Sequence, residues 1–402
     1  MICMDLTSPP SLNEHCFLVL MQSFFLHHRR KHGFFSSVPM REDRFGAMRG
    51  ADICTAAEWR AIVHDMTAML SLEDSREIFP VLEYGNGATL AECAHVLWRA
   101  WFNGARHVTF FTSGTTGTPR ACTHTEMELK QEVSFLRTLF SHNTAFLSSV
   151  SPHHLYGFTF GLYLPLSCGA PVRRTLPLST LLVSQMRCGD AVIGVPVLWN
   201  AVARGNLKTV EHDIVLVSAS APISPETLNI LEEYGYRLLD VFGSSETGVI
   251  GIRGSSREPY QLLPYFERSK GLQDELLRML PDGTVRKYPL MDTLNWQGAE
   301  KFYPAGRRDK AVQVGGVNVY PSHVAHQLEK IPEVAMCAVR LMDKGEGSRL
   351  KAFIVLKNGI DEHDFRRKLK TFLKNFSPEE RPVHFEFGQT LPRNDMGKLQ
   401  DW

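Results

Sequence analysis

The chain has 402 residues, of which 44% are hydrophobic and 22% are charged, and its formal net charge is +1. This length and composition are typical of a soluble globular protein with one large or two ordinary domains. A net charge near zero gives no reason to expect nucleic acid or an acidic membrane surface as a partner. The eight cysteines form no Cys-x-x-Cys pair and no zinc-like Cys/His spacing, so we expect reduced thiols in a cytoplasmic protein.

The first fifty residues carry the least information. The apolar run over residues 16–25 is too short to cross a bilayer, and it lacks the basic segment and cleavage site of a secretory signal. No membrane partner is therefore expected. Residues 27–32 predict a solvated charge run, with a metal site or a basic anchor as the less common alternatives. Because Met40 and Met48 follow, an upstream extension over residues 1–50 stays open.

Two helices and a strand are predicted before the first motif. Apolar residues recur at helical spacing over residues 55–72, after a cap at Thr55, and a second helix is predicted over residues 88–101. Residues 105–111 contain the run Val-Thr-Phe-Phe, which predicts a buried strand. The segment that follows therefore leaves the end of a strand.

That segment, residues 110–120, reads Phe-Phe-Thr-Ser-Gly-Thr-Thr-Gly-Thr-Pro-Arg. Its hydroxyls and glycines let backbone N–H and side-chain O–H donors surround an anion, and the planar guanidinium of Arg120 suits phosphate oxygens. The Walker pattern is absent, so the segment is either another kind of phosphate loop or an ordinary surface turn. The candidate phosphate ligands in it are Thr112, Ser113, Gly114, Thr115, Thr116 and Gly117.

An alternation of helices and short strands follows. Thr125 and Glu128 predict a capping box that begins an amphipathic helix. The apolar face of that helix consists of Leu129, Val133, Leu136 and Phe140. Strands are predicted at 145–150, 172, 191–195, 214–218 and 237–242, with helices at 176–186 and 225–234. This alternation predicts an α/β sheet with ligands held at strand ends.

The remaining segments predict a hairpin and a compact α+β unit. Residues 276–286 contain a Pro-Asp-Gly turn, which predicts the hairpin. Near the C-terminus, strands are predicted at 335–341, 350–356 and 383–387, with a basic amphipathic helix over residues 361–376.

Five motifs together resemble the adenylate-forming superfamily of acyl-CoA synthetases, adenylation domains and luciferases. Residues 112–120 resemble its signature loop, in which lysine is usual at the position of Arg120. Residues 151–160 include the family's spacing of histidine, aromatic residue and glycine, residues 241–248 resemble its aromatic-Gly-x-Thr-Glu motif, and residues 306–309 resemble its Gly-Arg-x-Asp hinge. Residues 392–398 match the closing Pro-Arg-x-x-x-Gly-Lys motif.

The resemblance implies roles for residues of the first domain. His154 would gate the carboxylate pocket, although a histidine among aromatic residues is by default a core residue, and no family role is assigned to His153. Phe242 would stack on adenine beside Gly243, Ser245 would donate to a phosphate, and Glu246 would hold Mg²⁺. An ordinary turn with a solvated glutamate is the alternative for these last residues. In residues 218–222 the family often has glycine where this chain has Ala219 or Ser220, a change that is expected to narrow the pocket.

Further roles are implied near the hinge and the C-terminus. Asp292 would accept the ribose hydroxyls, although the usual Thr-Gly before it is missing, and Arg307 would approach the ribose and phosphate. Asp309 would be the hinge, with Gly315 and Gly316 along the path of a pantetheine arm. A lysine near a C-terminus is usually a solvated charge, but the closing motif implies that Lys398 neutralises charge between the acid and the α-phosphate.

For the fold, the resemblance implies a large N-terminal α/β domain with mixed sheets over residues 1–306. A small C-terminal α+β lid over residues 307–402 would follow, with the hinge near Asp309. For the chemistry, it implies an ATP- and Mg²⁺-dependent acid–thiol ligase. A carboxylate oxygen attacks the α-phosphorus of ATP to give an acyl- or aryl-adenylate and pyrophosphate. The acyl group then passes to the thiol of coenzyme A or of the phosphopantetheine of an acyl carrier protein, two acceptors that stay open.

The small-molecule acid is predicted to be aromatic, such as a hydroxybenzoate or a cinnamate. The pocket candidates His154, Tyr156, Phe158, Trp199 and Phe242 favour an aromatic or medium-length acid over an amino acid, and the short region before the loop resembles compact ligases of aryl acids. The alternatives are a fatty or medium-chain acyl-CoA synthetase, transfer of the adenylate to an amine or to water, and a non-catalytic nucleotide-binding relative.

Overall fold

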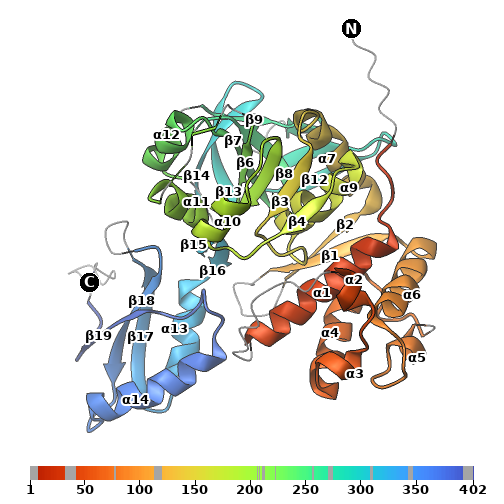
Figure 1. The fold of residues 1–402 in the computed structure, drawn as a ribbon. Coiled ribbons are helices and arrows are strands. Elements are labelled where there is room, and N and C mark those ends of the chain that lie inside the picture. The colour runs from red at the N-terminus through yellow and green to blue at the C-terminus, as the bar shows by residue number, and fades with distance from the viewer. Residues whose placement is uncertain are drawn as a thin grey trace. The chain divides into compact units, whose positions relative to one another are not determined.

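The computed structural model describes residues 8–31, 42–76, 78–112, 120–205, 207, 209–210, 213–221, 223–255, 258–269, 275–307, 311–342, 347–392 and 402. The chain folds into two compact units, whose elements are labelled in Figure 1. The larger unit comprises residues 1–111, 121–290 and 294–304, and the smaller unit comprises residues 112–120, 291–293 and 305–402. Asp309 lies outside the described residues, so the hinge there stays a prediction.

The N-terminal part of the larger unit consists mainly of helices, which are red and orange in Figure 1. Three of them contact the first helix, α1. The helices are α1 (Glu14–Lys31), α2 (Glu42–Gly46), α3 (Gly50–Ile53), α4 (Ala56–Met69), α5 (Phe79–Leu82) and α6 (Leu90–Asn103). Thr55 caps α4 and Thr89 caps α6, each in a capping box with the glutamate three residues later. The two helices predicted before the first motif are therefore confirmed, with small shifts of their ends.

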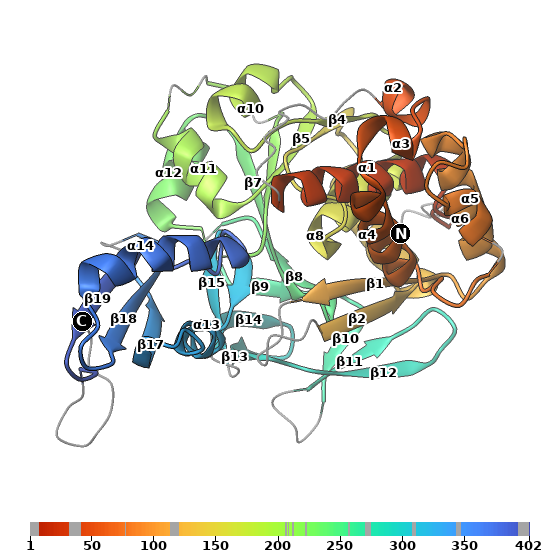
Figure 2. The ribbon, with the colours of Figure 1, turned by 90° about the horizontal axis from the view of Figure 1, so that it is seen from below.

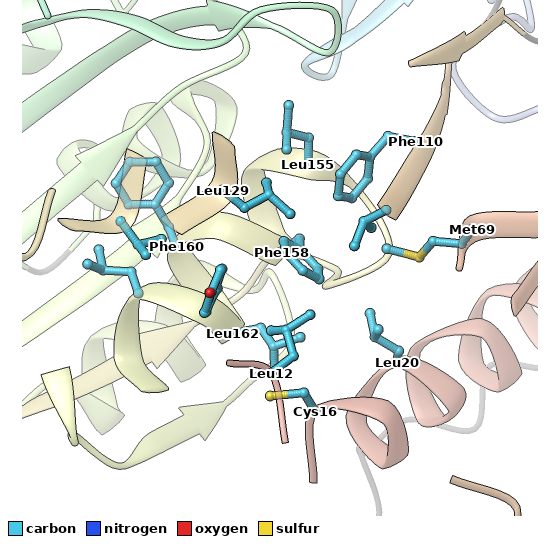
Figure 3. Packing of buried hydrophobic residues seen from close by; sticks show 14 of the residues in the cluster. Leu12, Cys16, Leu20, Met69, Phe110, Leu129, Leu155, Phe158, Phe160 and Leu162 are labelled. Atoms are coloured by element: carbon cyan, nitrogen blue, oxygen red, sulfur yellow. The ribbon is translucent and has the colours of Figure 1, made fainter. Parts of the chain in front are cut away.

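The apolar run near the N-terminus is a core segment of α1. Figure 3 shows Leu12, Cys16 and Leu20 in the same cluster as Phe110 and Phe158. All five side chains are nearly inaccessible to solvent, so burial of apolar surface holds α1 in the larger unit. Within the described residues, no helix is long and apolar enough to cross a membrane.

The prediction of a solvated charge run at residues 27–32 is wrong for its first two residues. His28 is only 8% exposed, and its Nε2 lies 3.0 Å from Oδ2 of Asp65 in α4. The ring of His27 packs against those of His28 and His153, with centroids 5.8 and 4.8 Å apart. The reason is that α1 continues through these histidines and packs on α4. The side chains of residues 30–32 lie outside the described part.

The main sheet contains nine strands among the described residues, in the order β13-β14-β9-β8-β7-β6-β5-β3-β4. Its strands are β3 (Ala145–Ser148), β4 (Val172–Arg174), β5 (Asp190–Gly194), β6 (Val215–Ser218), β7 (Arg237–Ser244), β8 (Gly248–Arg253), β9 (Tyr260–Leu262), β13 (Asp292–Gln297) and β14 (Lys301–Arg307). Strands β4, β3, β5, β6 and β7 run parallel, and β7–β8, β8–β9 and β9–β14 are antiparallel pairs. The five strands predicted from residue 145 to residue 242 are confirmed.

Helices cover both faces of the parallel strands (Figure 2). They are α7 (Glu126–Leu139), α8 (Leu155–Phe158), the π-helix η1 (Thr159–Tyr163), α9 (Leu164–Cys168), α10 (Ser179–Gln185), α11 (Pro196–Ala203) and α12 (Pro225–Glu233). Side chains alternate between faces along a strand, so Val192 and Leu216 pack with α10, α11 and α12. Ile193 and Val217 belong to the cluster that contains α7, α8 and α1. Burial on both faces is expected of parallel strands.

Two smaller sheets complete the larger unit. Strand β1 (His107–Thr112) pairs with β2 (Arg120–Thr125), and β10 (Phe266–Arg268), β11 (Glu275–Met279) and β12 (Val285–Pro289) form an antiparallel sheet. The predicted hairpin is confirmed as β11–β12, with Gly283 at φ +85° in its turn. The strand predicted over residues 105–111 is present. However, Phe111 is 46% exposed, because its side chain points away from the face that buries Phe110.

Helix α7 begins at the predicted capping box of Thr125 and Glu128 and buries its apolar face. Glu128 has a second role, because its carboxylate accepts hydrogen bonds from Arg286 Nη1, at 2.6 Å, and from the Tyr288 hydroxyl, both in β12. Arg278 in β11 is 1% exposed and donates to the Glu128 carbonyl oxygen at 2.6 Å. A buried polar network thus joins α7 to the three-stranded sheet.

The smaller unit contains a hairpin and an α+β core, which confirms the elements predicted near the C-terminus. Its elements are β15 (Val312–Val314), β16 (Val317–Val319), α13 (Pro321–Glu329), β17 (Val334–Leu341), β18 (Leu350–Leu356), α14 (Glu362–Phe372), the 3₁₀ turn η2 (Leu373–Asn375) and β19 (His384–Gly388). Gly315 and Gly316 form the two-residue turn between β15 and β16, with φ +60° and +86°, as hairpin turns of this kind require. Phe365 and Leu369 of α14 pack into the core with β17 and β18.

Candidate functional site

The carboxyl ends of the parallel strands define the candidate site. Because β3, β5, β6 and β7 run parallel, the segments that follow them meet at one edge of the sheet, where open α/β sheets bind ligands. The predicted motifs that begin at residues 151, 218 and 241 lie at or directly after these strand ends. The fold therefore brings three motifs together that are separated by up to about 90 residues in sequence.

The segment after β3 is fixed by close backbone packing. A Cβ atom at Gly157 would lie 2.1 Å from the Ser151 carbonyl oxygen, so only glycine fits there. The Tyr156 hydroxyl lies 2.8 Å from the Gly194 carbonyl oxygen and 3.0 Å from that of Val217, at the ends of β5 and β6. These contacts explain why an aromatic residue and a glycine occur together here, and they hold His154 next to the strand ends.

His154 is exposed and precedes the first turn of α8. Although solvent reaches its ring, desolvation by the surrounding protein lowers its pKa, which favours the neutral imidazole. Its ring lies 4.2 Å from that of His153, centroid to centroid. His153 in turn has Nδ1 2.7 Å from Ser23 Oγ and stacks on Phe24 in α1. Helix α1 therefore supports the segment that carries His154.

Two of the predicted pocket residues are core residues instead. Phe158 and Trp199 are both 0% exposed, and Phe158 packs edge-on against Phe110, with centroids 5.3 Å apart. Trp199 fills the space beside Gly194, where an added Cβ would lie 2.5 Å from its ring. Both predictions are wrong because an aromatic residue after a strand can point either to the ligand edge or between helix and sheet. Tyr156 and Phe242 remain half-buried.

The segment after β6 contains a strained residue. Ser220 has φ +78°, in the left-handed region that glycine adopts at little cost and other residues adopt only with strain. This conformation explains why glycine suits this position. The Ser218 side chain is completely buried, and its hydroxyl has no hydrogen-bond partner among the described residues.

Replacing Ser220 by glycine is expected to raise the free energy of unfolding by about 0.5–1 kcal/mol, because it removes the left-handed strain. Urea denaturation of the variant and the wild type measures this difference. Ser184→Gly, within α10, is the matched control, and glycine inside a helix should lower stability. A loss of stability in both variants would contradict the strain assigned to Ser220.

Two glycines flank the tight turn in the third motif. A Cβ atom at Gly243 would lie 2.1 Å from the Gly248 carbonyl oxygen, and Gly248 itself has φ +72°. Between them, Ser244 and Thr247 bond to each other through both backbone N–H groups and both hydroxyls, over 3.1–3.3 Å. Phe242, Ser245 and Glu246 are half-buried. The turn thus carries a hydroxyl and a carboxylate three and four residues after the half-buried aromatic residue.

Two buried residues outside the predicted motifs also contact this turn. His124 Nε2, in β2, lies 2.7 Å from the Ser245 carbonyl oxygen. Glu132 in α7 accepts a hydrogen bond of 2.9 Å from Val249 N–H, and burial raises the pKa of its carboxyl group. Sequence reasoning missed both residues. Their partners lie 121 and 117 residues further along the chain. The only sign of them in the sequence is a polar residue within a strand or a helix.

The other predicted ligands are only partly described. Ser113, Gly114, Thr115, Thr116, Gly117 and Lys398 lie outside the described residues. At the ends of that loop, the Thr112 hydroxyl contacts the Arg120 carbonyl oxygen at 3.5 Å. Asp292 begins β13 and Arg307 ends β14. The roles assigned to all these residues stay predictions.

Neither of two hollows in the structure coincides with the predicted ligands. One, of about 400 Å³, is lined by residues 252–254, 258, 259 and 261 with Leu239 and Lys301. A smaller one, of about 80 Å³, lies beside α3 and residues 83–88. Asp361, His363 and Asp364 form the one group in the described part of the chain whose ligand atoms could share a metal ion. All three are exposed, and Glu246 is not among them.

Comparison with known proteins identifies the family. Residues 105–267 match the model of the AMP-binding enzymes, and residues 323–398 match that of the AMP-binding enzyme C-terminal domain. A 4-coumarate–CoA ligase of Halorhodospira halophila is 36% identical over 296 residues, which cover 73% of this chain and 75% of that protein. The chain belongs to the AMP-binding enzyme family. A 4-coumarate–CoA ligase of Rhodobacter capsulatus is 35% identical over 301 residues, 73% of this chain and 74% of that protein.

Solved structures agree on the fold of this AMP-binding enzyme. The amide bond synthetase of Marinactinospora thermotolerans superposes with a TM-score of 0.63 at 16% identity, covering 95% of this chain and 92% of that one. The o-succinylbenzoate CoA synthetase of Bacillus subtilis gives a TM-score of 0.59 at 18% identity, over 73% and 67% of the two chains. At such identities the likeness concerns the fold alone. The resemblance to adenylate-forming enzymes and the predicted mixed α/β fold are both confirmed, and the protein is a member of a ligase family.

Proposed function

We propose that this AMP-binding enzyme is an aryl acid–CoA ligase. It would join a carboxylic acid to AMP with release of pyrophosphate, and then pass the acyl group to the thiol of coenzyme A. The observation that carries the proposal is the identity of 34–36% to three proteins named 4-coumarate–CoA ligase, each matched over at least 70% of its length. A carrier-protein phosphopantetheine presents the same thiol and is the second acceptor to test.

In this proposal the turn after β7 holds the nucleotide. The half-buried Phe242 would stack on the adenine, and the Ser245 hydroxyl would donate to a phosphate. Glu246 fits Mg²⁺, because a carboxylate oxygen is the ligand that this ion prefers, and bound Mg²⁺ would neutralise charge on the triphosphate. Asp292 and Arg307 would bind the ribose from the segments that begin β13 and end β14.

Charge neutralisation would supply most of the rate. Attack of the acid's carboxylate on the α-phosphorus brings two anions together, so positioned cations lower the barrier. Residues 112–117 would surround the phosphates with hydroxyl and N–H donors, and Arg120 and Lys398 would supply positive charge. His154, with its pKa lowered, would act as a neutral gate of the acid pocket. It would be neither acid nor base in the reaction.

An aromatic acid is the proposed substrate class. Tyr156 and Phe242, both half-buried, offer aromatic surface at the strand ends. Phe158 and Trp199 are buried in the core and do not support an aromatic substrate. The names of the relatives support a hydroxycinnamate over a fatty acid.

Pyrophosphate exchange into ATP tests the first step. The protein is incubated with Mg²⁺, ATP and labelled pyrophosphate, with one acid at a time from a panel of cinnamates, benzoates, fatty acids and amino acids. We expect exchange with hydroxycinnamates or benzoates. Exchange with fatty acids alone would show that the substrate is a fatty acid and not an aromatic acid. No exchange with any acid, despite ATP binding, would favour a non-catalytic nucleotide-binding protein.

The acceptor is tested with the acid that supports exchange. Coenzyme A, pantetheine and a small primary amine are added separately, and the products are identified by mass. We expect the CoA thioester to form fastest. A faster reaction with the amine would contradict the thiol as the acceptor while leaving adenylate formation in place.

A further inference from the structure

We propose that His124 is a positioning residue that fixes the Ser245–Glu246 peptide for the nucleotide. This inference rests on the proposed function, since it assigns to His124 the alignment of the groups that would bind phosphate and Mg²⁺. His124 lies in β2, the strand that leaves the signature loop, and Ser245 lies in the turn after β7. One hydrogen bond therefore links two segments that both belong to the candidate nucleotide site.

The hydrogen bond has a defined direction. A carbonyl oxygen can only accept, so the 2.7 Å contact to the Ser245 carbonyl requires a proton on His124 Nε2. His124 is 2% exposed, and desolvation by burial lowers its pKa, which keeps the ring neutral with one donor. Loss of this donor would leave a partly buried carbonyl oxygen without this hydrogen bond. The free-energy cost of an unsatisfied buried acceptor is larger than the net contribution of a solvent-exposed hydrogen bond.

The contact from His124 lies between two other anchors of the turn. Ser244 and Thr247 bond to each other across the turn, and Glu132 holds the backbone beyond it through Val249 N–H. These anchors hold the two ends of the turn, and the plane of the Ser245–Glu246 peptide lies between them. The bond from His124 to the Ser245 carbonyl sets that plane, and with it the direction in which the Glu246 side chain leaves the backbone.

The test compares two substitutions of His124. Glutamine has an amide N–H donor at a similar reach, whereas leucine fills the space without a donor. We expect His124→Leu to raise the KM for MgATP, in acid-dependent pyrophosphate exchange, on the order of tenfold, the effect of about one lost hydrogen bond. The KM for the acid should not change, and His124→Gln should stay within about threefold of the wild type.

Leu182→Ala controls for general loss of stability, because Leu182 is fully buried in the cluster on the other face of the sheet. It should lower the unfolding midpoint without changing the KM for MgATP. Equal losses in the leucine and glutamine variants, or equal changes in the KM for MgATP and for the acid, would overturn the proposal.

A second measurement does not depend on turnover. Amide hydrogen exchange of residues 244–248 should be faster in His124→Leu than in the wild type, and restored in His124→Gln. Should the wild type activate no acid, the proposed function fails, while hydrogen exchange and equilibrium MgATP binding still decide the role of His124. Unchanged exchange of these amides in His124→Leu would show that the bond does not position the turn.

Discussion

Replacing Lys398 by alanine is expected to lower acid-dependent pyrophosphate exchange at least about 100-fold, the loss seen when a charge-stabilising donor is removed from a transition state. The ammonium group would neutralise charge between the attacking carboxylate and the α-phosphate, so the adenylation rate should fall while MgATP still binds. Pyrophosphate exchange and equilibrium nucleotide binding, measured on the same preparations, separate the two effects.

Lys370→Ala is the control for this prediction, because Lys370 is an exposed lysine on α14 of the same unit. It should leave exchange unchanged. The Lys398→Ala variant should also convert a chemically synthesised acyl-adenylate into the CoA thioester at nearly the wild-type rate. Equal losses in both half-reactions would show that Lys398 serves the fold of the smaller unit, not the adenylation step.

Replacing Glu128 by alanine is expected to lower the free energy of unfolding by roughly 3 kcal/mol, because a buried carboxylate is lost together with its hydrogen bonds, and a hydrogen bond to a charged group contributes about 1.5–3 kcal/mol. The side chain of Glu128 is 0% exposed, and its loss would leave Arg286 and the Tyr288 hydroxyl without their acceptor. Urea denaturation measures the change. Glu92→Ala is the matched control, because Glu92 has the same place in the capping box of α6 but is exposed. Similar losses in both variants would assign the effect to helix capping alone.

Glu128 also predicts a dependence of stability on pH. Burial alone would raise its pKa, but hydrogen bonds from Tyr288, Thr125 and Arg286 outweigh burial and lower the pKa from 4.5 to about 2. A carboxylate with a lowered pKa stabilises the folded state above its unfolded pKa, so about 3 kcal/mol should be present above pH 4.5 and lost between pH 4.5 and 2. The stability difference between the wild type and Glu128→Gln should therefore shrink over this range. A constant difference would contradict the assignment.

Local sequence was sufficient to predict elements whose signals lie within a few residues. The capping box of Thr125 and Glu128 and the alternating strands from residue 145 onward depend on neighbours in the chain, and both are present. These features are set by backbone conformation and periodicity, which a single sequence carries.

Contacts between distant segments account for the failures. The burial of His28 depends on Asp65, 37 residues away, and no local pattern distinguishes this from a solvated histidine. Phe158 and Trp199 have the composition of pocket residues, yet the packing of α8 and α11 turns both into the core. The bond from His124 to Ser245 was missed for the same reason.

The burial of α1 has a consequence for gene expression. Met40 and Met48 are internal methionines, and translation that began at either would yield a polypeptide without α1. The surfaces of α4 and α6 that α1 covers would then be open to water, together with the partners of Leu12, Phe17 and Leu20. An exposed apolar surface of that kind promotes aggregation. Expression plasmids should therefore keep the codons upstream of Met40, so that α1 covers this apolar surface.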